Sequence, residues 1–67
     1  MTTLAEAAEA AERAAIQAAL RDAGGAVTRA AKALGCHPAT LHRKIDRLGL
    51  REWLDGFAAR ADRQPAR

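Results

Sequence analysis

Alanine supplies half of the residues from position 4 to position 23, and no proline interrupts this stretch. Because alanine is the strongest helix former among the common residues, the stretch favours one continuous helix. Thr3 and Glu6 have the spacing of a capping box at its start, and Gly24 follows where a helix commonly ends with a positive φ angle. The sequence therefore predicts a helix over about residues 4–22, which is long for a chain of 67 residues.

The rest of the chain also shows helical rather than strand patterning. Val27 is the only valine, and no alternating run of β-branched residues occurs. Three further helices are expected after the first, over about residues 27–34, 38–48 and 51–60. The expected fold class is all-α, a single small domain over residues 1–60, with a disordered tail over residues 61–67 that lacks a large apolar anchor.

The apolar spacing also predicts which side chains form the core. The second and third expected helices bury a common set of side chains, Ala30, Ala31, Leu34, Leu41, Ile45 and Leu48. Arg29 and Lys32 fall on the opposite, outward face of the second helix. Trp53, Leu54 and Phe57 share one face of the last helix, where they are expected to cover the core or a dimer seam, or alternatively to bind a partner protein.

Basic charge is concentrated in the middle of the chain. The net charge is +3, but residues 24–51 carry six basic residues against one acidic residue, whereas residues 1–23 carry more acidic than basic ones. Such a concentration is typical of a surface that binds phosphate, and the alternative is a solvated helix face.

The single cysteine and both histidines lie close together, between Cys36 and His42. A structural zinc site needs about four ligands, and steps of about 100° per residue do not bring His37 and His42 to one face. A Cys36–His37 pair lacks a third orienting group, and a domain this small has no room for a substantial pocket. We therefore expect no metal, no cofactor and no enzymatic activity.

The same composition indicates the compartment. A lone cysteine cannot form an internal disulfide and fits a reducing environment. There is no run of about eighteen apolar residues and no secretory leader pattern. A cytoplasmic protein with no membrane association is therefore expected.

Residues 27–48 are typical of a helix-turn-helix, since two short helices flank a tight turn and the second starts at Pro38 with outward basic residues. Ala31, Gly35 and Leu41 lie at relative positions 0, +4 and +10. The small Ala31 lets the two helices cross closely, Gly35 relieves the turn, and Leu41 fills the shared core.

The ordered sequence of residues 24–50, GGAVTRAAKALGCHPATLHRKIDRLGL, resembles the helix-turn-helix of the Fis family. That module occurs in the nucleoid protein Fis and at the C-terminus of NtrC-like activators of sigma-54 promoters. The resemblance rests on the double glycine, T-R-A-A, L-G, A-T-L-x-R-K and the closing L-G-L, in that order. The preceding AERAAIQAAL also resembles the dimerisation helix of the family.

The resemblance implies a homodimer that binds two half-sites of double-stranded DNA, with the helix over residues 38–48 in the major groove. The alanine-rich first helix also favours self-association, because it permits close packing but buries little area alone. The dimer interface is expected at Leu4, Ala8, Ala11, Ala15, Ile16 and Ala19. DNA contacts are expected from Thr28, Arg29, His37, Ala39, Thr40, His42, Arg43, Lys44 and Arg47.

Helix geometry indicates which of these residues face DNA most directly. Counting about 100° per residue from the inward Leu41 places Ala39 and Arg43 opposite the core. Ala39 is small enough to let the helix lie deep in a groove. Arg43 is expected to reach a base edge, where guanine is the usual partner of arginine.

Several positions depart from the family pattern. Ala26 stands where the family often has a capping asparagine, and His37 and Pro38 stand where it commonly has a serine or asparagine cap followed by an arginine. At His42 the family often has tyrosine or arginine, so its base preference does not transfer. Cys36 replaces a usually buried isoleucine or valine, and we therefore interpret it as a small core residue.

The function expected from these observations is that of a dimeric DNA-binding transcriptional regulator or nucleoid-associated protein, acting at the nucleoid in the cytoplasm. The same features suit the excised DNA-binding domain of a larger sigma-54 activator. A second class of function is protein–protein interaction, through the first helix and the face of Trp53 and Phe57. Salt dependence separates the two classes, because a DNA binder loses affinity steeply as salt rises.

Overall fold

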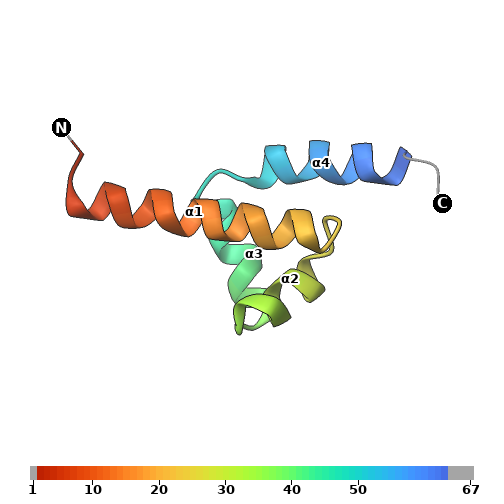
Figure 1. Cartoon of the computed structure of the whole chain (residues 1–67), viewed down its shortest axis with the longest axis horizontal. Coiled ribbons are helices and arrows are strands. Elements are labelled where there is room, and N and C mark those ends of the chain that lie inside the picture. The colour runs from red at the N-terminus through yellow and green to blue at the C-terminus, as the bar shows by residue number, and fades with distance from the viewer. Residues whose placement is uncertain (1, 64–67) are drawn as a thin grey trace.

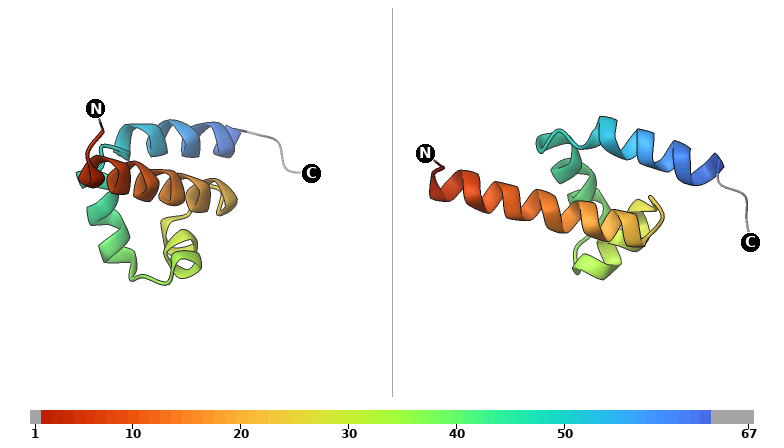
Figure 2. Two further views of the ribbon diagram at one scale, coloured as in Figure 1. Left: turned by 60° about the vertical axis from the view of Figure 1, so that its left-hand side comes forward. Right: turned by 45° about the horizontal axis from the view of Figure 1, so that its top comes forward.

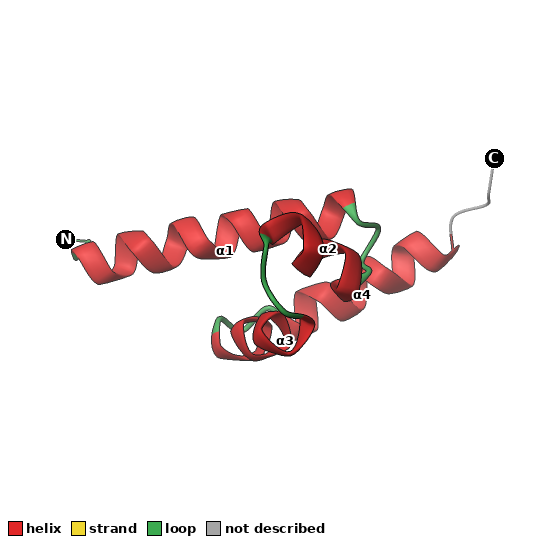
Figure 3. Cartoon of the chain, turned by 90° about the horizontal axis from the view of Figure 1, so that it is seen from below, coloured by secondary structure: helices red, strands yellow, loops and turns green. Residues whose placement is uncertain are grey.

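The computed structural model describes residues 2–63 and the side chains of residues 2–60. This part of the chain is all-α and consists of helices α1 (Leu4–Asp22), α2 (Val27–Leu34), α3 (Pro38–Arg47) and α4 (Arg51–Arg63) (Figure 1). A short loop joins α2 to α3, and both lie on the same side of α1, as the view from below shows (Figure 3). α4 runs past the C-terminal half of α1, and the N-terminal end of α1 projects beyond the other helices (Figure 2).

Local hydrogen bonds define both ends of α1. The Glu6 backbone N–H donates to the Thr3 hydroxyl at 3.1 Å, and the Thr3 N–H donates to the Glu6 carboxylate at 2.9 Å. This is the capping box that the sequence predicts. At the other end Gly24 has a φ of 65°, and the Gly25 N–H donates to the Leu20 carbonyl at 2.8 Å. The observed bounds of α1 coincide with the expected ones.

One hydrophobic core joins all four helices. Its members are each at most 6% exposed: Ile16, Leu20, Ala23, Ala30, Ala31, Leu41, Ile45, Leu48, Leu50 and Leu54. The stripe of Leu41, Ile45 and Leu48 is therefore buried as its helical spacing predicts. The prediction for Leu34 is wrong, because this side chain is 38% exposed. Leu34 is the last residue of α2, and the chain turns away at Gly35, so α1 and α3 line only one side of it.

α4 is longer than the sequence predicts. The helix expected over residues 51–60 continues to Arg63, so residues 61–63 are helical where disorder was expected. The physical reason is that the end of α4 is rich in alanine, a strong helix former, while Leu54 anchors the helix in the core. The rest of the expected tail, residues 64–67, lies outside the described part of the chain.

Candidate nucleic-acid interface

α2 and α3 form the helix-turn-helix that the sequence predicts, and one glycine makes the turn. Gly35 has a φ of 74°, and a Cβ there would meet no atom within 4 Å, so backbone conformation rather than lack of space favours glycine. The Cys36 N–H donates to the Ala31 carbonyl at 2.9 Å and closes the end of α2. Ala31 and Leu41 have no exposed surface, so α3 packs closely on α2 in one orientation.

The start of α3 is arranged by two residues that depart from the family pattern. His37 is the N-cap, and its Nδ1 accepts a hydrogen bond from the Ala39 N–H at 3.4 Å. Pro38 occupies the first helical position, where its missing N–H is no loss. α2 has Ala26 as its N-cap and no side-chain cap, as expected. α3 ends at Arg47, one residue before the expected end.

The outward face of α3 carries exposed side chains opposite the core. Leu41 has no exposed surface, whereas Ala39, His42 and Arg43 are exposed and Thr40 is half-buried. This arrangement matches the direction expected from helix geometry. α3 has ten residues, and an α-helix with its side chains is about 10–12 Å in diameter, a width that the major groove, about 12 Å wide, admits.

A shallow groove at the turn brings together polar residues of α2 and of the start of α3. It is lined by Thr28, Lys32, Gly35, Cys36, His37 and Pro38. Thr28 and His37, both expected to contact DNA, therefore lie at one site, and Lys32 joins them. Lys32 is expected from its position only on an outward face of α2, although its spacing of four from Thr28 indicates that the two share that face. A hydroxyl, an ammonium group and an imidazole are side-chain groups that hydrogen-bond phosphate oxygens.

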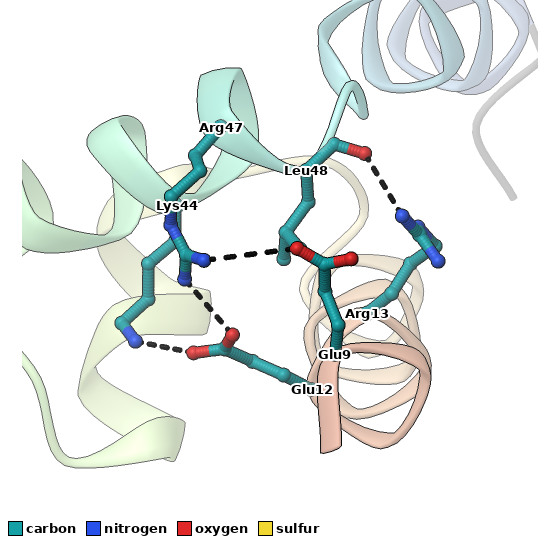
Figure 4. A network of polar contacts seen from close by, with 6 residues as sticks. All are labelled: Glu9, Glu12, Arg13, Lys44, Arg47 and Leu48. Carbon is teal, nitrogen blue, oxygen red and sulfur yellow. Dashed lines mark hydrogen bonds and ion pairs between the residues drawn. The ribbon is translucent and has the colours of Figure 1, made fainter. Parts of the chain in front are cut away.

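Lys44 and Arg47 are paired with carboxylates of α1 (Figure 4). The Lys44 ammonium donates to one oxygen of Glu12, and Arg47 Nη2 donates to the other oxygen at 3.0 Å. A second carboxylate, that of Glu9, lies 4.0 Å from Arg47 Nη1. Two residues expected to contact DNA are thus turned toward α1.

These pairs change the electrostatics of the candidate surface. Hydrogen bonds from Lys44 and then from Arg47 lower the pKa of Glu12 below its ordinary value, so the carboxylate stays ionised. One carboxylate therefore offsets part of the charge of two basic residues. Arg29 is exposed, and its Nη1 donates to the Ala23 carbonyl at 3.4 Å. The sequence shows acidic and basic segments but not which residues meet, since that depends on how α1 crosses α3.

A further basic residue, Arg51, lies beside α3 and is absent from the set that the sequence predicts. Its Nε donates to Asp46 Oδ1 at 2.9 Å, and its Nη2 lies 3.3 Å from His42 Nδ1. Asp46 and His42 are both exposed and stand one helical turn apart. The only signal for Arg51 in the sequence is its place at the end of the basic segment.

The residues expected at the dimer interface divide into two groups. Four of them are exposed along α1: Leu4, Ala8, Ala11 and Ala15. Ile16 is only 3% exposed and belongs to the core of the chain itself, because it faces the side of α1 on which α2 and α3 pack. Ala19 is half-buried against the same core. Ile16 is therefore a core residue, and the exposed residues of the expected interface are those nearer the N-terminus.

The aromatic face of α4 is used within the chain. Leu54 is 4% exposed and covers the core, which is one of the roles expected for it, and it is therefore not available for the alternative contact with a partner protein. The Trp53 and Phe57 rings stack with centroids 5.6 Å apart, and the Arg21 guanidinium lies 5.5 Å from the Trp53 ring centroid. Both aromatic residues are half-buried, and the contact of Trp53 with Arg21 joins α4 to the end of α1.

Cys36 is half-buried and packs against the core, close to the role expected for it. Among the described side chains, those of residues 2–60, no three of histidine, cysteine, aspartate or glutamate gather as metal ligands. In the same part of the chain, no helix combines the length and the apolar character that crossing a membrane requires.

Comparison with known proteins gives a family match over most of this domain. The sequence model of the family described as "Bacterial regulatory protein, Fis family" matches residues 7–48. The match spans more than half of the chain and includes most of α1 and all of α2 and α3, but not α4. No curated protein and no solved structure matches the chain.

Proposed function

The chain belongs to the Fis family of bacterial regulatory proteins, whose helix-turn-helix is a DNA-binding domain, and on this basis we propose that it is a dimeric DNA-binding regulator. Its role is that of a transcriptional regulator or a nucleoid-associated protein, acting at the nucleoid in the cytoplasm. In this proposal α3 enters the major groove, and two copies of the chain place their α3 helices on two half-sites of double-stranded DNA.

The exposed face of α3 is the observation that supports this proposal most strongly. Arg43 lies opposite the buried Leu41, and it takes part in none of the ion pairs within the described residues. Its guanidinium donors are therefore available for a guanine edge, which arginine contacts with two hydrogen bonds. The neighbouring Ala39 has no side chain long enough to hold the helix away from the base pairs.

The groove at the turn is suited to position α3 on the DNA backbone. Thr28, Lys32 and His37 line it from both sides, and contacts of this kind to phosphate fix the register of a protein on DNA. We propose that these three residues bind one phosphate region while Arg43 contacts bases. Lys44 and Arg47 have a smaller role in this proposal, because Glu12 competes with phosphate for both of them.

The proposed dimer forms through the exposed side of α1. The N-terminal end of this helix projects beyond the rest of the domain (Figure 1), and Leu4 at its start is 91% exposed. Ala8, Ala11 and Ala15 continue from Leu4 with side chains small enough for close helix packing. A second copy of α1 would cover these residues and supply the additional buried area that a small domain needs.

The alternative expected from the sequence, an interaction module without DNA binding, has less support. Leu54 is buried, Trp53 contacts Arg21 of α1, and Phe57 stacks on Trp53, so little of that face is available to a partner. The proposed DNA surface would serve equally in a free-standing regulator and as the DNA-binding domain of a larger sigma-54 activator.

Salt-dependent DNA binding tests the proposal. Fluorescence anisotropy with a labelled duplex of mixed sequence should give an affinity that falls with salt, with a log–log slope of about −0.9 for each phosphate contact. Arg43→Ala should weaken binding most for a duplex selected from a random pool, because Arg43 is assigned to base contacts. The matched control is Arg60→Ala, which removes the same charge from an exposed position on α4. Affinity that is independent of salt, or equal losses in the two variants, would contradict the proposal.

A further inference from the structure

We propose that Arg51 is a positioning residue for DNA recognition, which holds His42 as a hydrogen-bond donor on α3 and neutralises the adjacent Asp46. This inference rests on the proposed function, because it assigns a role within the DNA-facing surface of α3. Arg51 lies outside residues 7–48, the part that matches the Fis family, so the role comes from the α4 of this chain.

The backbone around Arg51 is firmly held, although its side chain is partly exposed. Gly49 turns the chain with a φ of 71°, and the Leu50 N–H donates to the Ile45 carbonyl at 2.9 Å. Leu50 and Leu54 are each 4% exposed, so the first turn of α4 is anchored in the core. The Arg51 side chain therefore extends from a fixed position next to the last turn of α3.

The contact with His42 selects one tautomer of the neutral imidazole ring. Arg51 Nη2 lies 3.3 Å from His42 Nδ1. A guanidinium has donors and no acceptor, so Nδ1 must accept in this contact. The proton of the neutral ring is then on Nε2, and His42 offers a donor rather than an acceptor to DNA.

The contact with Asp46 removes an unfavourable charge from the same surface. The Asp46 side chain is 64% exposed, and an unpaired carboxylate there would repel DNA phosphates. Arg51 Nε donates to its Oδ1 at 2.9 Å, which offsets that charge. One arginine thus orients His42 and neutralises Asp46 on adjacent turns of α3.

A donor at His42 restricts which base it accepts on the strand that it faces. In the major groove guanine, adenine and thymine each present an acceptor, whereas cytosine presents only an amino donor. We therefore expect cytosine to be disfavoured at the base position that His42 faces. A single hydrogen bond of this kind corresponds to discrimination of roughly 2- to 12-fold.

Selection from a randomised duplex pool, followed by sequencing, tests this role in the full chain. Arg51→Met should remove the discrimination against cytosine at one position and leave the other positions unchanged. In the His42→Ala background, Arg51→Met should cause no further change in discrimination, because its effect on base choice passes through His42. Arg60→Met is the matched control, since it makes the same substitution at an exposed position of α4.

The alternative outcomes are distinguishable. If Arg51 contacts a phosphate directly and does not act through His42, Arg51→Met weakens binding to all sequences equally, lowers the salt slope by about one and keeps the discrimination against cytosine, which overturns the proposal. If the wild-type chain shows no salt-dependent binding, the proposed function and this inference both fail. If the wild type binds and Arg43→Ala loses affinity, but Arg51→Met keeps its discrimination, only the inference about Arg51 fails.

A measurement on the free wild-type protein needs no variant and therefore does not depend on whether Arg51→Met folds. The nitrogen-15 chemical shifts of the His42 ring distinguish the two neutral tautomers. The Nε2–H tautomer is expected at neutral pH. A predominant Nδ1–H tautomer would overturn the proposal, because two donors cannot share the observed contact.

Discussion

The substitution Glu12→Gln tests whether a carboxylate of α1 weakens the binding of α3 to DNA. Glu12 holds Lys44 with one carboxylate oxygen and Arg47 Nη2 with the other, at 3.0 Å for the arginine. Both cations come from the helix that we place in the major groove. A glutamine keeps the shape of the side chain but removes the charge that competes with phosphate for these two residues.

The expected change in the salt slope follows from the number of basic side chains, Lys44 and Arg47, that Glu12 no longer holds. Each one that reaches a phosphate makes the log–log salt slope more negative by about 0.9, so two add about 1.8. When salt rises from about 50 to about 200 mM, that difference corresponds to an additional loss of affinity of about 12-fold. At the lower salt concentration Glu12→Gln should bind mixed-sequence DNA more tightly than the wild type. The extra affinity is not specific for sequence, because phosphate contacts carry no base information.

Anisotropy titrations at four or more salt concentrations measure this slope. Glu6→Gln is the matched control, because it removes the same charge from α1 and glutamine retains the capping box at that position. The reasoning is refuted if Glu12→Gln and Glu6→Gln have the same slope, since Lys44 and Arg47 would then not be held back by Glu12.

Three further predictions concern stability and assembly. Because the pKa of Glu12 is lowered in the folded chain, its stabilising contribution is complete above the ordinary value of 4.5 and is lost as pH falls through the folded value. The difference in unfolding free energy between the wild type and Glu12→Gln should therefore shrink on acidification, as urea unfolding at several pH values can measure. Leu54→Ala should lower the unfolding free energy by about 2–5 kcal/mol, as thermal or urea unfolding can measure. Leu34→Ala should lower it by clearly less, because Leu34 is 38% exposed. Equal losses in the two variants would contradict a core role for α4. Ala11→Glu should shift the chain toward monomer in analytical ultracentrifugation while Ala59→Glu does not, and an unchanged dimer would exclude α1 as the interface.

Much of the fold could be predicted because its determinants are local. The capping box at Thr3 and Glu6, the left-handed Gly35 and the proline at the start of α3 each act within a few residues. The direction of Arg43 also followed from helix geometry, since Leu41 defines the inward side and the two residues are only two positions apart. These features needed no knowledge of how distant segments meet.

The errors concern contacts between distant segments. The pairing of Lys44 with Glu12 joins residues 32 positions apart and depends on how α1 crosses α3. The same crossing buries Ile16 in the core and leaves one side of Leu34 exposed. Arg51 was missed because its role depends on the turn between α3 and α4. Spacing along one helix shows which side a residue faces, but not which neighbour covers that side.

Backbone amide chemical shifts, recorded while duplex DNA is added to the full chain at low salt, test the central claim most directly. The account predicts that the largest changes occur from His37 to Arg43 and around Thr28 and Lys32, while the N-terminal end of α1 and the end of α4 change little. Changes confined to α1 and α4, with α3 unaffected, would contradict it.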